Sequence, residues 1–192
     1  MREIYLEESV ETVDKSFQKK KYLILSISSI FCYVFGFAWA LIFFYLVKNL
    51  EFINYIVIFF PFFLFVGIGY VIGSFKHRAI VDFDYSFTSG TVRFAKVYNE
   101  SRRKTIISFE NNNIEKIGRY NSDFFKKYSL VDSIKNIPLT NNSISTNNKG
   151  FYYIVVNKNG EKYLFTLECT YNFINAIISY SNNYVVEEGF YK

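Results

Sequence analysis

Two apolar runs dominate the sequence: YLILSISSIFCYVFGFAWALIFFYLV at residues 22–47 and FINYIVIFFPFFLFVGIGYVIGS at residues 52–74. They hold 26 and 23 residues without a charge. About 20 residues are enough for a helix, which rises about 1.5 Å per residue, to cross about 30 Å of hydrocarbon. Because only residues 48–51 connect the runs, the two helices must be antiparallel. The sequence therefore predicts a transmembrane helical hairpin over residues 22–74.

Orientation follows from the basic residues close to these runs. Five lie before the first run, one lies between the runs and two follow the second: Arg2, Lys15, Lys19, Lys20 and Lys21, then Lys48, then Lys76 and Arg78. We therefore expect a multi-pass protein of the cell (cytoplasmic) membrane, with two spans and both termini in the cytoplasm. Because neither run contains a charged residue or a histidine, we expect no ion or proton pathway through the hairpin.

Small residues recur on both predicted helices and identify candidate packing surfaces. They are Ser28, Cys32, Gly36 and Ala40, each four residues apart, and Gly69 and Gly73 in a GxxxG pattern. Small residues allow helices to approach each other closely within a membrane. The simplest interpretation is that the two ridges face one another and hold the hairpin together. The alternative is that one of them forms the interface of a homo-oligomer.

Residues 1–21 are expected to form a short amphipathic N-terminal helix or a tail. Leu6, Val10, Val13 and Phe17 are spaced by four, three and four residues, which places them on one stripe of a helix. The remaining face is acidic, so its attraction to anionic lipid is weak. We expect this segment to dock on the protein's own domain, with a frayed acidic tail as the alternative.

Residues 75–192 have the pattern of a mostly-β (α+β) domain. Val81, Phe83 and Tyr85 alternate with polar residues at the period of a strand that has one wet face. The predicted strands are residues 81–87, 91–98, 105–109 and 114–120 in a four-stranded meander, followed by a hairpin of residues 151–156 and 161–168. Residues 121–150 favour either a short helix near residues 124–130 or a mobile loop. Thr170 is expected to cap a final helix with an apolar face.

This order of elements resembles a pleckstrin-homology-like (PH-like) domain. The residues that carry the resemblance are Tyr85, Phe87, Thr88, Gly90 and Val92, then Arg102, Arg103 and Lys104, then Ile106, Ile107, Ile114 and Ile117. The whole chain is similar to an uncharacterised family of small two-span membrane proteins of Gram-positive bacteria with a C-terminal cytoplasmic PH-like domain. The resemblance implies a small barrel or two-sheet domain of about six to seven strands, closed by a C-terminal helix. It implies no activity.

No residue pattern indicates an enzyme, a metal site or a cofactor. His77 is the only histidine and lies at the predicted membrane edge, and Cys32 and Cys169 are far apart in the sequence. Asp82 and Asp84 share a strand face but lack the further ligands that cation binding or acid–base catalysis requires. We interpret them as part of a wet strand face. No catalytic, cofactor-binding or metal-binding residue is therefore predicted.

The charge distribution limits the class of partner. The formal net charge is +5, divided as +2 over residues 1–78 and +3 over residues 79–192, without the concentrated surplus that nucleic-acid binding requires. This balance fits an anionic membrane leaflet and equally a simple solubility effect. Arg102, Arg103 and Lys104 are predicted to lie on a hairpin turn, where they are the candidate contact for membrane lipid or a partner protein. A solvated charged turn is the alternative.

Together these observations predict a non-enzymatic integral membrane protein whose PH-like domain binds a partner protein or anionic lipid at the cytoplasmic surface. The alternative is an accessory subunit of a transporter or envelope enzyme complex, which would contact that complex through the helical hairpin.

Overall fold

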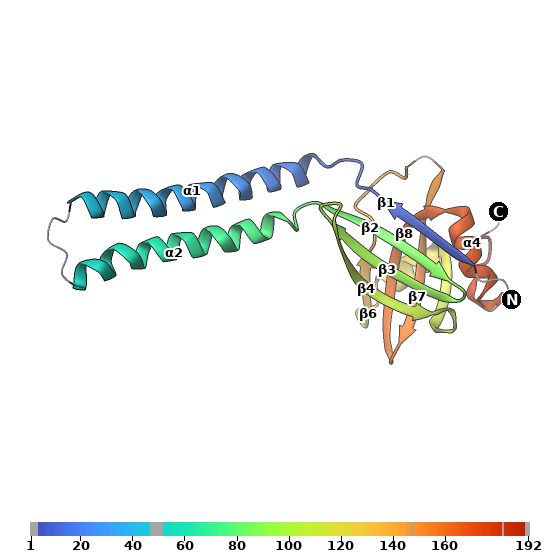
Figure 1. The fold of residues 1–192 in the computed structure, drawn as a ribbon. Helices are drawn as coiled ribbons and strands as arrows, with labels where there is room; N and C mark the ends of the chain where they lie inside the picture. The colour runs from blue at the N-terminus through green and yellow to red at the C-terminus, as the bar shows by residue number, and fades with distance from the viewer. Residues whose placement is uncertain (1–3, 47–51, 147, 182, 191–192) are drawn as a thin grey trace. The chain divides into compact units, whose positions relative to one another are not determined.

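The computed structural model describes residues 4–46, 52–146, 148–181 and 183–190 (Figure 1). The chain divides into two compact units. The β unit consists of Met1–Asp14 and Val81–Lys192, and the helical unit consists of Lys15–Ile80. In chain order, the helical unit is therefore an insertion within the β unit.

Two long helices make up the helical unit. They are α1 (Ser16–Leu46) and α2 (Phe52–Lys76). The segments Ser16–Tyr45 and Phe59–Lys76, with mean hydropathies of 2.1 and 1.6, are long and apolar enough to cross a membrane. This matches the two predicted runs, although α1 begins six residues earlier than the first run. Residue 47 and the connector 48–51 lie outside the described residues.

The first sheet of the β unit has four antiparallel strands in the order β1-β2-β3-β4. They are β1 (Tyr5–Val10), β2 (Val81–Thr88), β3 (Thr91–Tyr98) and β4 (Arg102–Glu110). β1 and β2 lie side by side, although the whole helical unit separates them in the sequence (Figure 1).

The predicted N-terminal helix is therefore wrong, because residues 5–10 form a strand. The four-residue spacing of Leu6 and Val10 fits a helical stripe and one face of a strand equally well. Residue 8 distinguishes the two periods. Glu8 is partly buried on the same face of β1 as Leu6 and Val10, as the two-residue period of a strand requires. The expected docking on the protein's own domain does occur, as a strand of its first sheet.

The second sheet also has four strands, in the order β5-β7-β8-β6. They are β5 (Ile114–Arg119), β6 (Ile134–Pro138), β7 (Lys149–Lys158) and β8 (Glu161–Thr170), with β6 parallel to β8 and the other pairs antiparallel. The fourth strand of the predicted meander is β5, so it belongs to the second sheet and not to the first. Residues 121–150 contain α3 (Asp123–Ser129), which matches the helical alternative, and β6, which the sequence did not indicate.

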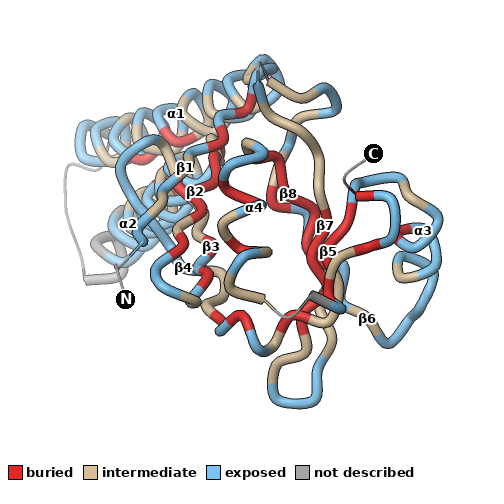
Figure 2. Tube along the Cα trace, turned by 90° about the vertical axis from the view of Figure 1, so that its right-hand side faces the viewer, coloured by how far each residue is buried: buried red, intermediate tan, exposed pale blue. Residues whose placement is uncertain are grey.

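The core lies between the two sheets and is closed by α4 (Tyr171–Ser179). Figure 2 shows buried residues on both sheets and along α4. The largest fully buried side chains include Tyr85, Phe87, Phe94, Phe165 and Phe173. α4 begins as predicted, because the Thr170 hydroxyl accepts a hydrogen bond of 3.3 Å from Phe173 N–H. Two short 3₁₀ helices, η1 (Asn111–Asn113) and η2 (Asn183–Val185), complete the elements of the described chain.

The predicted fold class is thus confirmed as an apolar helical pair with a mostly-β domain and a C-terminal helix. The domain is a pair of sheets without closure into a barrel. Eight strands are present in the described residues, in place of the expected six to seven, because β1 and β6 were not anticipated.

Two valines distinguish a strand from a helix at the N-terminus. Val10 is 1% exposed and Val13 is 70% exposed, whereas a helical stripe would bury both. We expect Val10→Ala to lower the free energy of unfolding by about 1–3 kcal/mol. Val13→Ala, the matched control, should change it by less than about 0.5 kcal/mol. Denaturant unfolding of the β unit, with a flexible linker joining residue 14 to residue 81, measures the stability of both variants. Equal losses of unfolding free energy would contradict the assignment of residues 5–10 to a strand.

Candidate functional site

The basic residues singled out by the sequence lie on a strand and not on a turn. Arg102, Arg103 and Lys104 are the first three residues of β4, and their partners on β3 are Tyr98, Val97 and Lys96 respectively. The turn before them consists of residues 99–101. Because successive strand residues point to opposite faces, Arg103 lies on one face of the sheet, while Arg102 and Lys104 lie on the other.

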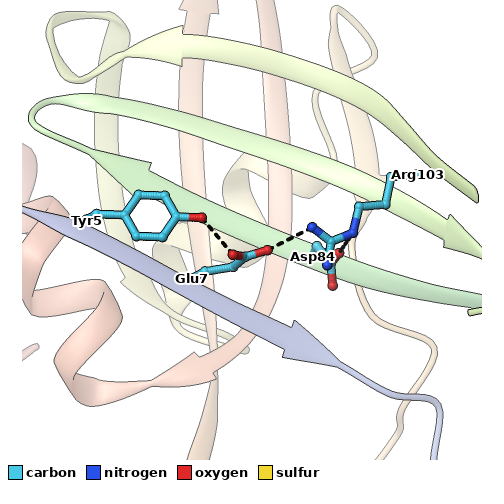
Figure 3. Close-up of polar contacts among 4 residues, drawn as sticks. All are labelled: Tyr5, Glu7, Asp84 and Arg103. Atoms are coloured by element: carbon cyan, nitrogen blue, oxygen red, sulfur yellow. Dashed lines mark hydrogen bonds and ion pairs between the residues drawn. The ribbon is translucent and has the colours of Figure 1, made fainter. Parts of the chain in front are cut away.

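Arg103 is held by two carboxylates on the same face of the sheet, one from β1 and one from β2 (Figure 3). Its Nη1 lies 3.0 Å from Glu7 Oε1, and its Nε lies 2.9 Å from Asp84 Oδ2. The side chain reaches across β3, where the residue opposite Asp84 is the small Ala95. Arg103 therefore ties β4 to β2 and β1.

Tyr5 completes this cluster. Its hydroxyl donates a hydrogen bond of 2.6 Å to Glu7 Oε2. This hydrogen bond, followed by the positive charge of Arg103, lowers the pKa of Glu7 despite the opposing effect of burial. Glu7 therefore stays ionised and paired with Arg103 at neutral pH.

The two aspartates of β2 do not form the expected wet face. Asp82 and Asp84 are only 6% and 7% exposed. Asp82 Oδ1 accepts a hydrogen bond of 2.9 Å from Thr12 N–H, and Asp84 faces Arg103. The sequence did not reveal this role because the covering residues come from the N-terminal segment, about 70 residues away in the chain.

Arg102 and Lys104 remain available for contacts outside the chain. Both are exposed, and neither has an ion-pair partner among the described residues. Lys104 lies opposite Lys96, whose ammonium group lies 5.9 Å from the centre of the Phe83 ring. Three cationic side chains thus gather at this end of the first sheet, which we call the basic edge: Lys96, Arg102 and Lys104.

The small residues of the helical unit lie largely between its own two helices. A Cβ atom on Gly36 would lie 3.3 Å from Phe65 Cβ, and one on Gly69 would lie 3.2 Å from Cys32 Cβ. A Cβ atom on Gly73 would lie 3.2 Å from Ser29 Oγ, close enough to require a shift of the neighbour.

Ser29 is the buried serine of this contact. Its hydroxyl donates a hydrogen bond of 2.8 Å to Gly69 O, while Ser28 and Ala40 are only partly buried. The sequence interpretation thus selected the neighbour of the serine that bonds across the hairpin. A regular spacing of four residues favoured Ser28, although a helix repeats every 3.6 residues.

Glu168 organises the polar segment of residues 139–146, part of the stretch for which the sequence favours a short helix or a mobile loop. Its side chain is fully buried on β8. One carboxylate oxygen accepts hydrogen bonds of 2.8 Å from both the N–H and the hydroxyl of Thr146. The other accepts hydrogen bonds from Thr140 (2.8 Å) and Asn142 (2.7 Å). Burial alone would raise the pKa of Glu168, but these hydrogen bonds outweigh it and lower the pKa.

Asn141 and Asn142 connect this segment to the chain on both sides of the helical unit. Asn142 accepts a hydrogen bond of 2.8 Å from Val13 N–H and donates one of 2.9 Å to Glu11 O. Asn141 donates a hydrogen bond of 3.1 Å to Val81 O. We call residues 11–13 and 81–82 the neck segments, because they lead into and out of the helical unit.

Cys169, the cysteine of the β unit, is enclosed by the core. Cys169 is fully buried, and burial raises the pKa of its thiol well above the ordinary value. Within the described residues, no three His, Cys, Asp or Glu side chains are grouped so as to hold a metal ion.

A family model described as Bacterial PH-like domain (DUF6106) matches residues 2–187. The matched range includes both the β unit and the helical unit. The resemblance to PH-like domains that the sequence indicated is therefore confirmed. No curated protein and no solved structure matches the chain.

Loss of Arg103 should be more damaging than loss of its neighbour. Arg103→Ala leaves Asp84 buried without its cation, which we expect to cost about 1–3 kcal/mol of unfolding free energy. Arg102→Ala removes the same charge from the same strand without breaking an ion pair and should change stability by less than about 0.5 kcal/mol. Denaturant unfolding of both variants tests this difference. Equal losses of unfolding free energy would show that the ion pairs of Arg103 do not stabilise the sheet.

The buried carboxylate predicts the behaviour of the domain in acid. Because folding lowers the pKa of Glu168, its contribution is present above the unfolded value of about 4.3 and disappears as the pH falls through the folded value. In Glu168→Gln, an amide replaces the carboxylate that accepts hydrogen bonds from four donors. We expect this variant to lose about 1–3 kcal/mol of unfolding free energy at pH 7. The difference between wild type and variant should shrink in acid. A difference that is constant from pH 7 to pH 3 would contradict an ionised Glu168.

Proposed function

The chain belongs to this bacterial PH-like family, and on that basis we propose that it is a non-enzymatic integral membrane protein. In this proposal the β unit is held at the cytoplasmic surface, where it binds a partner protein or anionic lipid. The non-enzymatic part rests on the binding character of the fold and is an argument by analogy.

The observation that carries the proposal is the insertion of the helical unit between two paired strands. β1 pairs with β2 from Tyr5↔Thr88 to Val10↔Phe83. The chain thus leaves the domain after β1 and returns to it at the neighbouring strand. If each helix crosses the membrane once, both neck segments must lie on one side, and the domain stays at that surface. The excess of lysine near the start of α1 favours the cytoplasmic side.

The basic edge gives this surface a candidate contact. Val81 is paired with Tyr98, and Tyr98 is paired with Arg102, so Arg102 lies at the end of the sheet where the chain enters from the helical unit. A basic residue near an anionic leaflet contributes about 1 kcal/mol to membrane binding. Arg102 and Lys104 are the residues to which we assign this role, because Arg103 is occupied by Glu7 and Asp84.

The alternative role, an accessory subunit that contacts a larger complex through the hairpin, has less support. Gly36 and Gly69 are the small residues that such a contact would use, and both already face the opposite helix of the hairpin. The exposed residues of α1 and α2 are mainly large and apolar, as a lipid-facing surface requires.

Vesicle binding tests the lipid branch of the proposal. We expect the β unit, with residue 14 joined to residue 81, to sediment with vesicles that contain phosphatidylglycerol and not with pure phosphatidylcholine. Substitution of both Arg102 and Lys104 by Ser removes two cations and should weaken partitioning by about 2 kcal/mol, or about 30-fold.

The matched control replaces Lys126 and Lys127 of α3 by Ser, which removes the same charge from another exposed site. This control should bind almost as well as wild type. If both double variants lose binding equally, net charge and not the basic edge is responsible. If the wild-type β unit does not bind anionic vesicles, the proposal of lipid binding is wrong. A partner protein is then the remaining ligand proposed for the basic edge.

A further inference from the structure

A pocket of about 340 Å³ opens on the face of the second sheet that points away from the main core. Its lining comes from β6, β7, β8, α3, the residue after β5 and the segment between β6 and β7: Tyr120, Phe125, Asn136, Pro138, Thr140, Asn142, Ser143, Phe151 and Thr166. The volume is within the range of pockets that enclose small ligands. All the lining residues belong to the β unit.

The strand order gives the pocket two different walls. β5 and β7 are neighbours. Tyr120 directly follows β5 and Phe151 belongs to β7, and the centres of their rings are 5.9 Å apart. Phe125 of α3 packs against Tyr120 at 4.6 Å and extends this wall. β8 and β6 lie on the other side and supply Thr166 and Asn136. One wall is therefore aromatic, and the other carries hydroxyl and amide groups.

Several polar groups of the pocket have no partner within the described chain. Thr166 is 8% exposed, and its hydroxyl makes no hydrogen bond to any described residue. The polar groups of the Tyr120, Asn136 and Ser143 side chains likewise make no hydrogen bond to a described residue. A hydroxyl that lines an open pocket without a partner in the described chain can bond to water or to a ligand there.

Among the described residues that line the pocket none is charged, which limits the ligand. A phosphate or carboxylate group would find no cation, and a cationic ligand would find no carboxylate. We propose that the pocket binds a neutral saccharide, with the apolar face of the sugar ring on Tyr120 and Phe151 and its hydroxyls toward Thr166 and Asn136. This site is separate from the basic edge and does not depend on lipid binding there.

The segment of residues 140–143, which lines the pocket beside the polar wall, is held in place before any ligand arrives. Thr140 and Asn142 both donate to the buried carboxylate of Glu168, and Asn142 N–H donates a hydrogen bond of 3.1 Å to Thr140 Oγ1. A lining segment that is already ordered loses little conformational entropy when a ligand binds.

Saturation-transfer NMR tests the site on the full chain in lipid nanodiscs free of glycoside detergent. The probe is N-acetylglucosamine, which carries hydroxyls and one amide, and the charged comparison is glucuronate. Irradiation of the protein's aromatic protons should transfer saturation to the ring protons of N-acetylglucosamine and much less to those of glucuronate. Thr166→Val keeps the side-chain shape without the hydroxyl and should weaken binding about two- to tenfold.

Asn136→Trp blocks the pocket from an exposed position and should abolish the transfer. Asn112→Trp places the same side chain at an exposed asparagine of η1, outside the pocket, and should leave the transfer unchanged. The proposal is overturned if wild type shows no transfer, if glucuronate or adenosine is preferred, or if Asn136→Trp binds the sugar as well as Asn112→Trp does.

Discussion

The pairing of β1 with β2 is the constraint on which the rest of the structure depends. It joins two segments separated by the entire helical unit, and six residue pairs define its register. The pairing buries Val10 and places Glu8 beside Thr170, whose N–H donates a hydrogen bond of 3.0 Å to Glu8 Oε2. Through Glu8, the first strand therefore also contacts the residue that caps α4. The N-terminal segment is a structural part of the domain and not an appendage of the hairpin.

β1 also explains why Arg102, Arg103 and Lys104 have different roles. β1 brings Glu7 to the outer face of the first sheet, where Glu7 and Asp84 together hold Arg103. Without β1, Arg103 would have only Asp84 as a carboxylate partner. Alternation along β4 sends Arg102 and Lys104 to the other face. Three consecutive basic residues thus have two roles, one in bracing the sheet and one at the basic edge.

Local patterns could be read from the sequence, whereas long-range pairings could not. The two apolar helices, the β7–β8 hairpin and the Thr170 cap depend on residues close together in the chain, and all three were predicted correctly. β1 was misassigned because Leu6 and Val10 satisfy both periods, and β6 was missed because its sequence, IKNIP, has only two aliphatic residues. The partners of Arg103 lie 96 and 19 residues away, and no sequence pattern connects them. The pocket likewise depends on strand order, which composition does not reveal.

The segment of residues 139–146 has two physical roles. Asn142 lines the pocket and also holds the first neck segment through Val13 N–H and Glu11 O. Asn141 holds the second neck segment through Val81 O. Glu168 holds the same segment through buried hydrogen bonds to Asn142 and Thr146. The position of this segment is therefore linked to the position of the neck segments. A ligand can shift such an arrangement only by binding one position of the segment more tightly than another. Asn142 lines the pocket and also bonds to the first neck segment. A ligand that favours one position of Asn142 would therefore also favour one position of residues 11–13.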